Sequence, residues 1–112
     1  MNLLSQILEA KDIAAEEVVV PEWGATIGLR GMTARQRADF AKVAATDPAK
    51  ATVRALIDCA FDPATPDKPL FETAHQDALL KKSGKAIDDL VKVIIRLSGF
   101  DTEAEKELEK NS

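Results

Sequence analysis

The chain has 112 residues and a formal net charge of −4, and 46% of its residues are apolar and 30% charged. This composition is typical of one globular domain with a modest core, and its acidic balance argues against a nucleic-acid partner, because phosphate binding needs a concentrated positive field. The single cysteine, Cys59, excludes an internal disulfide, and the lack of a bilayer-spanning apolar run or a secretion signal predicts a cytoplasmic protein with no membrane partner.

A short amphipathic helix is predicted at residues 2–11, followed by a β-hairpin at residues 18–30. The apolar side chains of this helix have the spacing of one helical face, and they are Leu3, Leu4, Ile7 and Leu8. So short a helix is marginal unless it docks, so it is either the first core helix or a free, sticky arm. In the hairpin, β-branched residues and alternating apolar residues predict two strands joined at Gly24. A lone hairpin is barely stable, so its apolar face must lie on the helices or pair with another chain.

Two N-cap signals predict the next two helices. The segment Thr33–Gln36 has the spacing of a capping box, and it predicts an alanine-rich helix that runs to about Ala45. The dipeptide Asp47-Pro48 predicts the N-cap and first residue of another helix, which we expect to run to about Phe61.

A proline-rich loop and a second capping box come next. The segment Asp62–Pro69 contains three prolines, which break both helices and sheet ladders, so we expect an extended loop. The segment Thr73–Gln76 again has capping-box spacing, and it predicts a short helix that ends near Ser83-Gly84.

The run 85–98 predicts the helix at the centre of the fold. Its apolar residues fill an arc of roughly 200° on a helical wheel, which is too wide for one neighbour, so at least two other elements must pack around it. Gly99 is expected to end this helix in the left-handed conformation, and Phe100 to close back over the last turn.

These elements predict a mainly helical α+β fold of about five to six helices with one N-terminal β-hairpin. We expect residues 1–112 to form one domain, because no repeat or linker indicates a second. In the free-arm alternative, residues 1–15 are a loosely attached helix. Residues 101–112 are expected to form a frayed C-terminal helix, since they carry little apolar surface.

The residue types that carry most catalytic and metal chemistry are isolated in this sequence. His75 is the only histidine and has no cysteine or second histidine at ligand spacing, which favours a solvent-facing helix residue. Cys59 follows Asp58, whose charge would raise its pKa rather than activate it. Arg35 faces Asp39 across one helical turn, which favours a solvated helix face over a nucleic-acid patch. We therefore predict no enzyme, no cofactor, and no catalytic or metal-binding residue.

Several short segments occur in a characteristic order and spacing over roughly residues 18–112. They are Val20–Gly24, Leu29–Arg37 followed by Phe40, Lys68–Phe71, Leu79–Ser83, Leu97–Gly99 and Glu109–Ser112. In this series the chain resembles the tail assembly chaperones of long, non-contractile-tailed bacteriophages and prophages. Each segment is a structural signature, and none is a catalytic one.

The resemblance implies a non-enzymatic assembly factor that binds the phage tape measure protein in the host bacterial cytoplasm and is absent from the mature virion. The tape measure is a long helical chain with apolar stripes, which would self-associate if left bare. Chaperone copies are expected to coat it until the tail tube protein polymerises around it and displaces them. The resemblance also implies a longer form made by programmed ribosomal frameshifting, since Lys110-Asn111 is what a slippery A-rich heptamer would encode.

The family motif marks fold positions, so the contact surface is a separate hypothesis. We expect the first helix and the hairpin to mediate self-association or client contact through Leu3, Leu4, Ile7, Leu8, Val18, Val20, Trp23 and Ile27. The major tail tube protein is a second candidate partner. The alternative function is an unrelated small cytoplasmic adaptor or regulatory binding module, which the gene neighbourhood would distinguish.

Overall fold

A computed structural model describes residues 2–100 of the chain. Their elements are α1 (Leu3–Glu9), β1 (Ala15–Val20), a 3-10 turn (Pro21–Trp23), β2 (Ala25–Arg30), α2 (Ala34–Ala44), α3 (Pro48–Cys59), β3 (Ala60–Phe61), a second 3-10 turn (Thr73–His75), α4 (Gln76–Leu80) and α5 (Gly84–Leu97). Five helices and a three-stranded antiparallel sheet with an N-terminal hairpin make this an α+β fold, which confirms the predicted class. The helix predicted near the C-terminus lies outside the described residues.

The hairpin forms where it was predicted. Strand β1 pairs antiparallel with β2 in a register that runs from Ala15 opposite Arg30 to Val20 opposite Ala25. Gly24 closes the turn between them with a φ of 57°, a left-handed conformation that glycine adopts without steric cost. The first strand begins earlier than the predicted Val18, because the backbone pairing continues to Ala15.

A third strand was missing from the prediction. Helix α3 ends at Cys59 rather than at Phe61, and Ala60 and Phe61 pair with Leu29 and Gly28 of β2. The Phe61 ring lies over Gly28 so closely that a β-carbon at that position would overlap it. The strand is only two residues long, and β2 offers it a free edge, so tertiary pairing overrides the helical pattern here.

The N-caps of α2 and α3 are those predicted from the sequence. The Thr33 hydroxyl accepts the backbone N–H of Gln36 at 3.2 Å, and the Gln36 side chain accepts the N–H of Thr33 at 3.0 Å. The Asp47 carboxylate caps α3 by accepting the N–H of Lys50 at 3.1 Å. Each bond satisfies a backbone donor that the first turn of the helix leaves without a partner.

Two predicted boundaries around α4 are wrong. The capping interaction before α4 joins Glu72 and His75, where the Glu72 N–H donates to Nδ1 of His75 at 2.9 Å, rather than Thr73 and Gln76. Ser83 and Gly84 do not end the short helix. Ser83 is instead the N-cap of the next one, α5, and its hydroxyl accepts the N–H of Ala86 at 3.2 Å.

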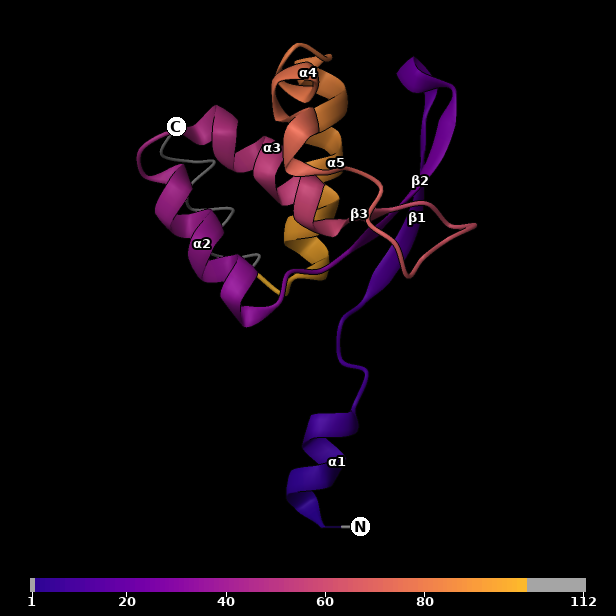
Figure 1. The fold of residues 1–112 in the computed structure, drawn as a ribbon, viewed down its shortest axis with the longest axis vertical. Coiled ribbons are helices and arrows are strands. Elements are labelled where there is room, and N and C mark those ends of the chain that lie inside the picture. The colour runs from indigo at the N-terminus through magenta and orange to yellow at the C-terminus, as the bar shows by residue number, and fades with distance from the viewer. Residues whose placement is uncertain (1, 101–112) are drawn as a thin grey trace.

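Helix α5 is the centre of the core, as its apolar arc predicted. It packs against α3 on one side and against both strands of the hairpin on another, while α2 covers the far side of α3 (Figure 1). Its buried residues are Ala86, Ile87, Leu90, Val91 and Ile94. Gly99 ends the helix with a φ of 75°, and the Phe100 N–H reaches back to the Ile95 carbonyl at 3.4 Å, which confirms the predicted termination.

Candidate protein-binding surface

Helix α1 stands away from the rest of the fold (Figure 1). The Asn2 side chain caps it by accepting the Ser5 N–H at 2.8 Å, and none of its residues is buried. Its four predicted contact residues are all exposed: Leu3 by 69%, Leu4 by 65%, Ile7 by 60% and Leu8 by 74%. None of the α1 residues belongs to the hydrophobic core cluster. We call residues 2–13 the arm.

The helix of the arm is unstable on its own unless a partner covers its apolar side chains. A helix of 7 residues is too short to persist in water through its own hydrogen bonds. Ile13, in the linker that follows, is also exposed. A contiguous row of exposed apolar side chains on a short helix is typical of a segment that binds another protein.

Most of the hairpin residues that were predicted to contact a partner lie on the face that is turned toward the core. Val20 is 3% and Ile27 is 5% exposed, and both belong to the core. Val18 and Trp23 are half-buried and pack against that core. These side chains therefore hold the hairpin onto α5, and they offer little surface to a partner in this conformation.

The accessible apolar residue of the hairpin is Val19, which the sequence reasoning did not name. It is 68% exposed and lies on β1, an outer strand of the sheet. The period of two along a strand was the signal that could have found it, because Val18 and Val20 share one face and Val19 must point to the other. Near the start of the same strand, Glu16 pairs with Arg96 of α5.

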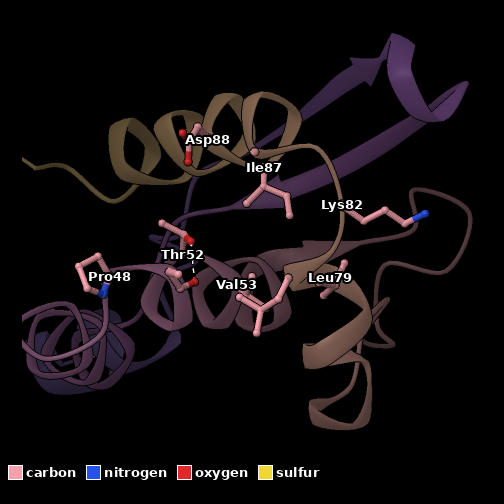
Figure 2. A pocket seen from close by; sticks show the side chains of 10 residues that line it. Pro48, Thr52, Val53, Leu79, Lys82, Ile87 and Asp88 are labelled. Atoms are coloured by element: carbon pink, nitrogen blue, oxygen red, sulfur yellow. Dashed lines mark hydrogen bonds between the residues drawn. The ribbon is translucent and has the colours of Figure 1, made fainter.

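A shallow apolar groove lies between the first turns of α3 and α5 and the short helix α4 (Figure 2). Its volume is about 290 Å³. Val53, Leu79 and Ile87 form its floor, and Lys82 and Asp88 stand at its edge. This volume is at or below the lower end for sites of drug-sized ligands, so the groove suits a few apolar side chains better than a small molecule. We call it the α3–α4–α5 groove.

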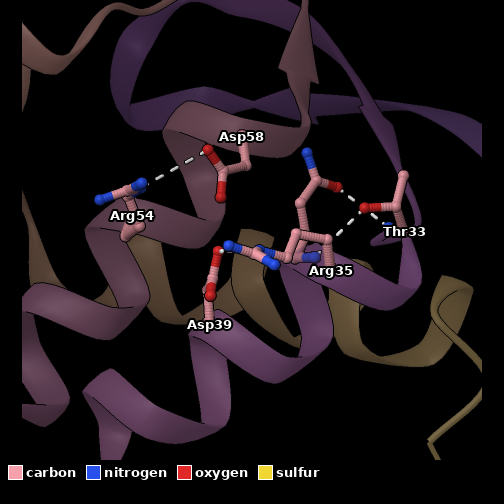
Figure 3. A network of polar contacts seen from close by, with 6 residues as sticks. Thr33, Arg35, Asp39, Arg54 and Asp58 are labelled. Atoms are coloured by element: carbon pink, nitrogen blue, oxygen red, sulfur yellow. Dashed lines mark hydrogen bonds and ion pairs between the residues drawn. The ribbon is translucent and has the colours of Figure 1, made fainter.

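Two arginines, one on α2 and one on α3, form ion pairs across one turn of their own helix. Arg35 pairs with Asp39 at 3.6 Å, as predicted, and Arg54 pairs with Asp58 at 3.6 Å (Figure 3). Burial raises the pKa of the Asp58 carboxyl even though Arg54 lowers it. The Arg35–Asp39 pair is exposed and contributes little to stability, whereas Asp58 of the second pair is half-buried.

Two other arginines lie over aromatic rings. The guanidinium of Arg30 is 4.4 Å from the centre of the Phe61 ring and donates to the Pro66 carbonyl at 2.8 Å. The guanidinium of Arg37 is 4.3 Å from the centre of the Phe100 ring. Both arginines therefore contact groups of their own chain, which disfavours the nucleic-acid patch considered from the sequence.

The residues with reactive side chains do not converge. Burial raises the pKa of the Cys59 thiol to about 12, and the Asp58 charge adds to this, so the thiol is protonated and inert at neutral pH. His75 is exposed, and its Nδ1 accepts the Glu72 N–H in the turn before α4. Among residues 2–100, no group of three or more His, Cys, Asp or Glu side chains could hold a metal ion. Within the same range no helix has the length and apolarity to span a membrane.

The described residues thus define a small α+β protein whose most distinctive surface is apolar and suited to binding another polypeptide. No protein-family model matches the chain, and no curated protein has a significantly similar sequence. Among solved structures, it is similar to the tail assembly chaperone of bacteriophage HK97, with 25% sequence identity and a TM-score of 0.66. The match covers 88% of this chain and 95% of that chain.

The structural similarity supports the family resemblance predicted from the sequence, namely that to phage tail assembly chaperones. It supports a chaperone role in tail assembly, with phage tail proteins as partners in general, and it favours a non-enzymatic function.

Proposed function

We propose that this chain binds the phage tape measure protein in the host cytoplasm and keeps it soluble until the tail tube polymerises. The observation that carries the proposal is the exposed apolar face of α1 on a fold similar to a tail assembly chaperone. An assembly chaperone must make contacts that its client can later surrender. A short exposed helix meets that requirement, because it can release its client without unfolding the core.

Co-expression with a fragment of the tape measure protein tests this function. The proposal predicts that the fragment is recovered in the soluble fraction with the wild-type chain and precipitates without it. Leu4→Asp places a charge on the apolar face of the arm and is expected to lower the soluble yield. Gln6→Asp adds the same charge to the other face of the same helix and is the matched control, because it leaves all four apolar side chains in place.

The outcomes separate the function from the surface assigned to it. If the fragment stays insoluble with the wild-type chain, the tape-measure function is wrong. If the wild-type chain succeeds and both Leu4→Asp and Trp23→Ala, while folded, work as well, then the client binds neither through the apolar face of the arm nor through Trp23.

Two further parts of the proposal have simple tests. A longer frameshifted product requires a slippery run of codons at Lys110-Asn111, and codons without such a run would remove that part of the proposal.

The unrelated-adaptor alternative is favoured if the gene lies away from genes for a major tail protein and a very long tape measure. A place between those two genes supports the chaperone, with the tail tube protein as the partner that displaces it, and absence of the chaperone from purified virions is expected.

A further inference from the structure

The sheet has one covered edge and one open edge among residues 2–100. Beyond β3, a bridge between Phe61 and Pro69 extends the sheet, so that edge is covered by the chain itself. Strand β1 forms the other edge, and no described segment pairs with it. Proteins usually protect an edge strand with lysine, proline, a bulge or a very short length. Strand β1 has 6 residues in continuous register and contains neither lysine nor proline.

The register of the hairpin fixes which backbone groups of β1 point to the open edge. The Gly31 N–H donates to the Ala14 carbonyl at 2.9 Å, and bonded and non-bonded pairs alternate along an antiparallel ladder. The residues whose backbone bonds β2 are therefore Glu16, Val18 and Val20. The residues whose N–H and C=O groups point to the open edge are Ala15, Glu17 and Val19. These groups can bond an added strand without disturbing the hairpin.

The side chains beside the open edge restrict which strand fits. On the solvent face, Val19 is 68% exposed and offers an apolar contact to the residue opposite. On the other face, a notch of about 40 Å³ lies between β1 and α5, and Val18, Ala86 and Leu90 are among its lining residues. A notch of this size admits only a small side chain. An added strand therefore needs an apolar residue opposite Val19 and a small one opposite Val18.

The charge along the open edge is negative. The segment 15–24 contains three glutamates and neither lysine nor arginine. Glu16 is held by Arg96 of α5, whereas Glu17 and Glu22 take part in none of the ion pairs found among residues 2–100. Opposite charges that face each other across two strands stabilise the pairing, so a basic side chain is favoured opposite Glu17.

We propose that the open edge of β1 binds an extended segment of a different protein as a fourth, antiparallel strand. Read from its N-terminus, this segment has an apolar, a small and a basic residue, which lie opposite Val19, Val18 and Glu17. A second copy of β1 does not match, because β1 carries two glutamates and no basic residue. The edge is separate from the apolar face of the arm, so it is a further polypeptide-binding site beyond the proposed function.

Nuclear magnetic resonance of the full chain tests this site with a peptide probe, Thr-Ile-Ala-Lys-Thr-Lys, blocked at both ends. Its second to fourth residues supply the apolar, small and basic side chains. The amides of Glu17 and Val19 are expected to shift and to exchange more slowly with solvent when the probe is added. The amides of Glu16 and Val18 are expected to keep their exchange rates, because they already bond β2. This alternation distinguishes strand addition from binding to the side chains alone.

A charge swap tests the contact at Glu17. The Glu17→Lys variant is expected to bind the probe about two- to tenfold more weakly. It is expected to bind more tightly than the wild type a second probe, which has glutamate in place of the first lysine. Glu9→Lys makes the same change of charge at the end of α1 and is the matched control, since Glu9 lies outside the edge strand.

A backbone deletion tests the hydrogen bonds. Val19→Pro removes the N–H that points to the open edge and leaves the bonds to β2 in place, a position at which edge strands tolerate proline. It is expected to weaken binding about two- to tenfold. Val19→Thr keeps the N–H and the branched shape of the side chain, so a smaller effect is expected.

Three results would overturn the proposal. The first is a probe that leaves the β1 amides unchanged at millimolar concentration. The second is equal weakening by Glu17→Lys and Glu9→Lys, which would mean that only the net charge matters. The third is protection of the Glu17 and Val19 amides in the chain alone that rises with its concentration, which would mean that a second copy covers the edge. The probe contains no tape measure sequence, so these results leave the chaperone function as a separate question.

Discussion

Ser98, the residue that follows α5, bonds the backbone of Met32 and so fixes the chain leaving the hairpin to the end of the central helix. Its hydroxyl accepts the Met32 N–H at 2.8 Å and donates to the Ile94 carbonyl at 2.6 Å. Ser98 and Met32 are 66 positions apart in the sequence, and Met32 is buried. The arm joins the fold close to this junction, because the N–H of the neighbouring Gly31 donates to the Ala14 carbonyl.

Ser98→Ala is expected to lower the free energy of unfolding by about 1–3 kcal/mol, because it leaves the Met32 N–H without a partner in a part-buried place. Urea denaturation measures this change. Thr46→Ala is the control, since it removes an exposed hydroxyl that bonds the Val43 carbonyl at 3.2 Å and is expected to change stability by less than about 0.5 kcal/mol. Equal effects of the two substitutions would contradict the role given to Ser98.

Gly28→Ala is expected to destabilise the fold by about 1–3 kcal/mol, because its methyl group would overlap the Phe61 ring. Removing that ring as well should relieve the overlap. In a double-mutant cycle, Gly28→Ala is then expected to cost less stability in the Phe61→Ala background than in the wild type. Gly84→Ala is the control, because nothing lies within 4 Å of the added carbon. A cycle whose two effects simply add would show that β3 does not pack on β2 in this way.

Because Val19 and Val20 point to different faces of β1, replacing each by alanine is expected to have a different effect on stability. Val20→Ala removes buried methyl groups and is expected to cost about 1–3 kcal/mol, whereas Val19→Ala removes exposed ones and is expected to have little effect on stability. Urea midpoints of the two variants measure the difference. Similar midpoints would mean that the hairpin does not lie on α5 with Val20 inward.

Because the Cys59 thiol is buried, the free energy of unfolding is expected to fall at alkaline pH. The pKa of Cys59 is raised to about 12 in the folded chain from 9.0, so above pH 9 the unfolded chain loses this proton and the folded chain keeps it. The stabilisation is fully present below pH 9 and is lost as the pH rises toward 12, by at most about 1.4 kcal/mol per pH unit. The wild type is thus expected to lose stability from pH 9 to 10.5 faster than Cys59→Ala. Parallel curves for the two proteins would contradict this burial.

The sequence was most informative where local chemistry decides the structure. The caps at Thr33 and Asp47 and the left-handed Gly99 each depend on backbone groups within a few residues, so they could be predicted. The wide apolar arc of α5 likewise required several covering elements, which the structure provides.

Other features depend on contacts distant in sequence or on close competition. Strand β3 forms because β2 has a free edge, and nothing in Ala60 or Phe61 alone indicates it. The capping signals at Glu72 and Thr73 compete one residue apart. The spacing of Leu4 and Leu8 is the same in a docked helix as in a free one, so periodicity could not decide whether α1 joins the core.

The most direct test of the central claim is to mix the purified chain with a purified tape measure fragment and measure their elution by size exclusion with light scattering. A chaperone that binds through its apolar surface predicts one peak that contains both proteins, with a mass above that of either alone, and loss of that peak for Leu4→Asp but not for Gln6→Asp. Separate elution of the two proteins at every concentration, with the fragment precipitating as it does alone, would contradict the account.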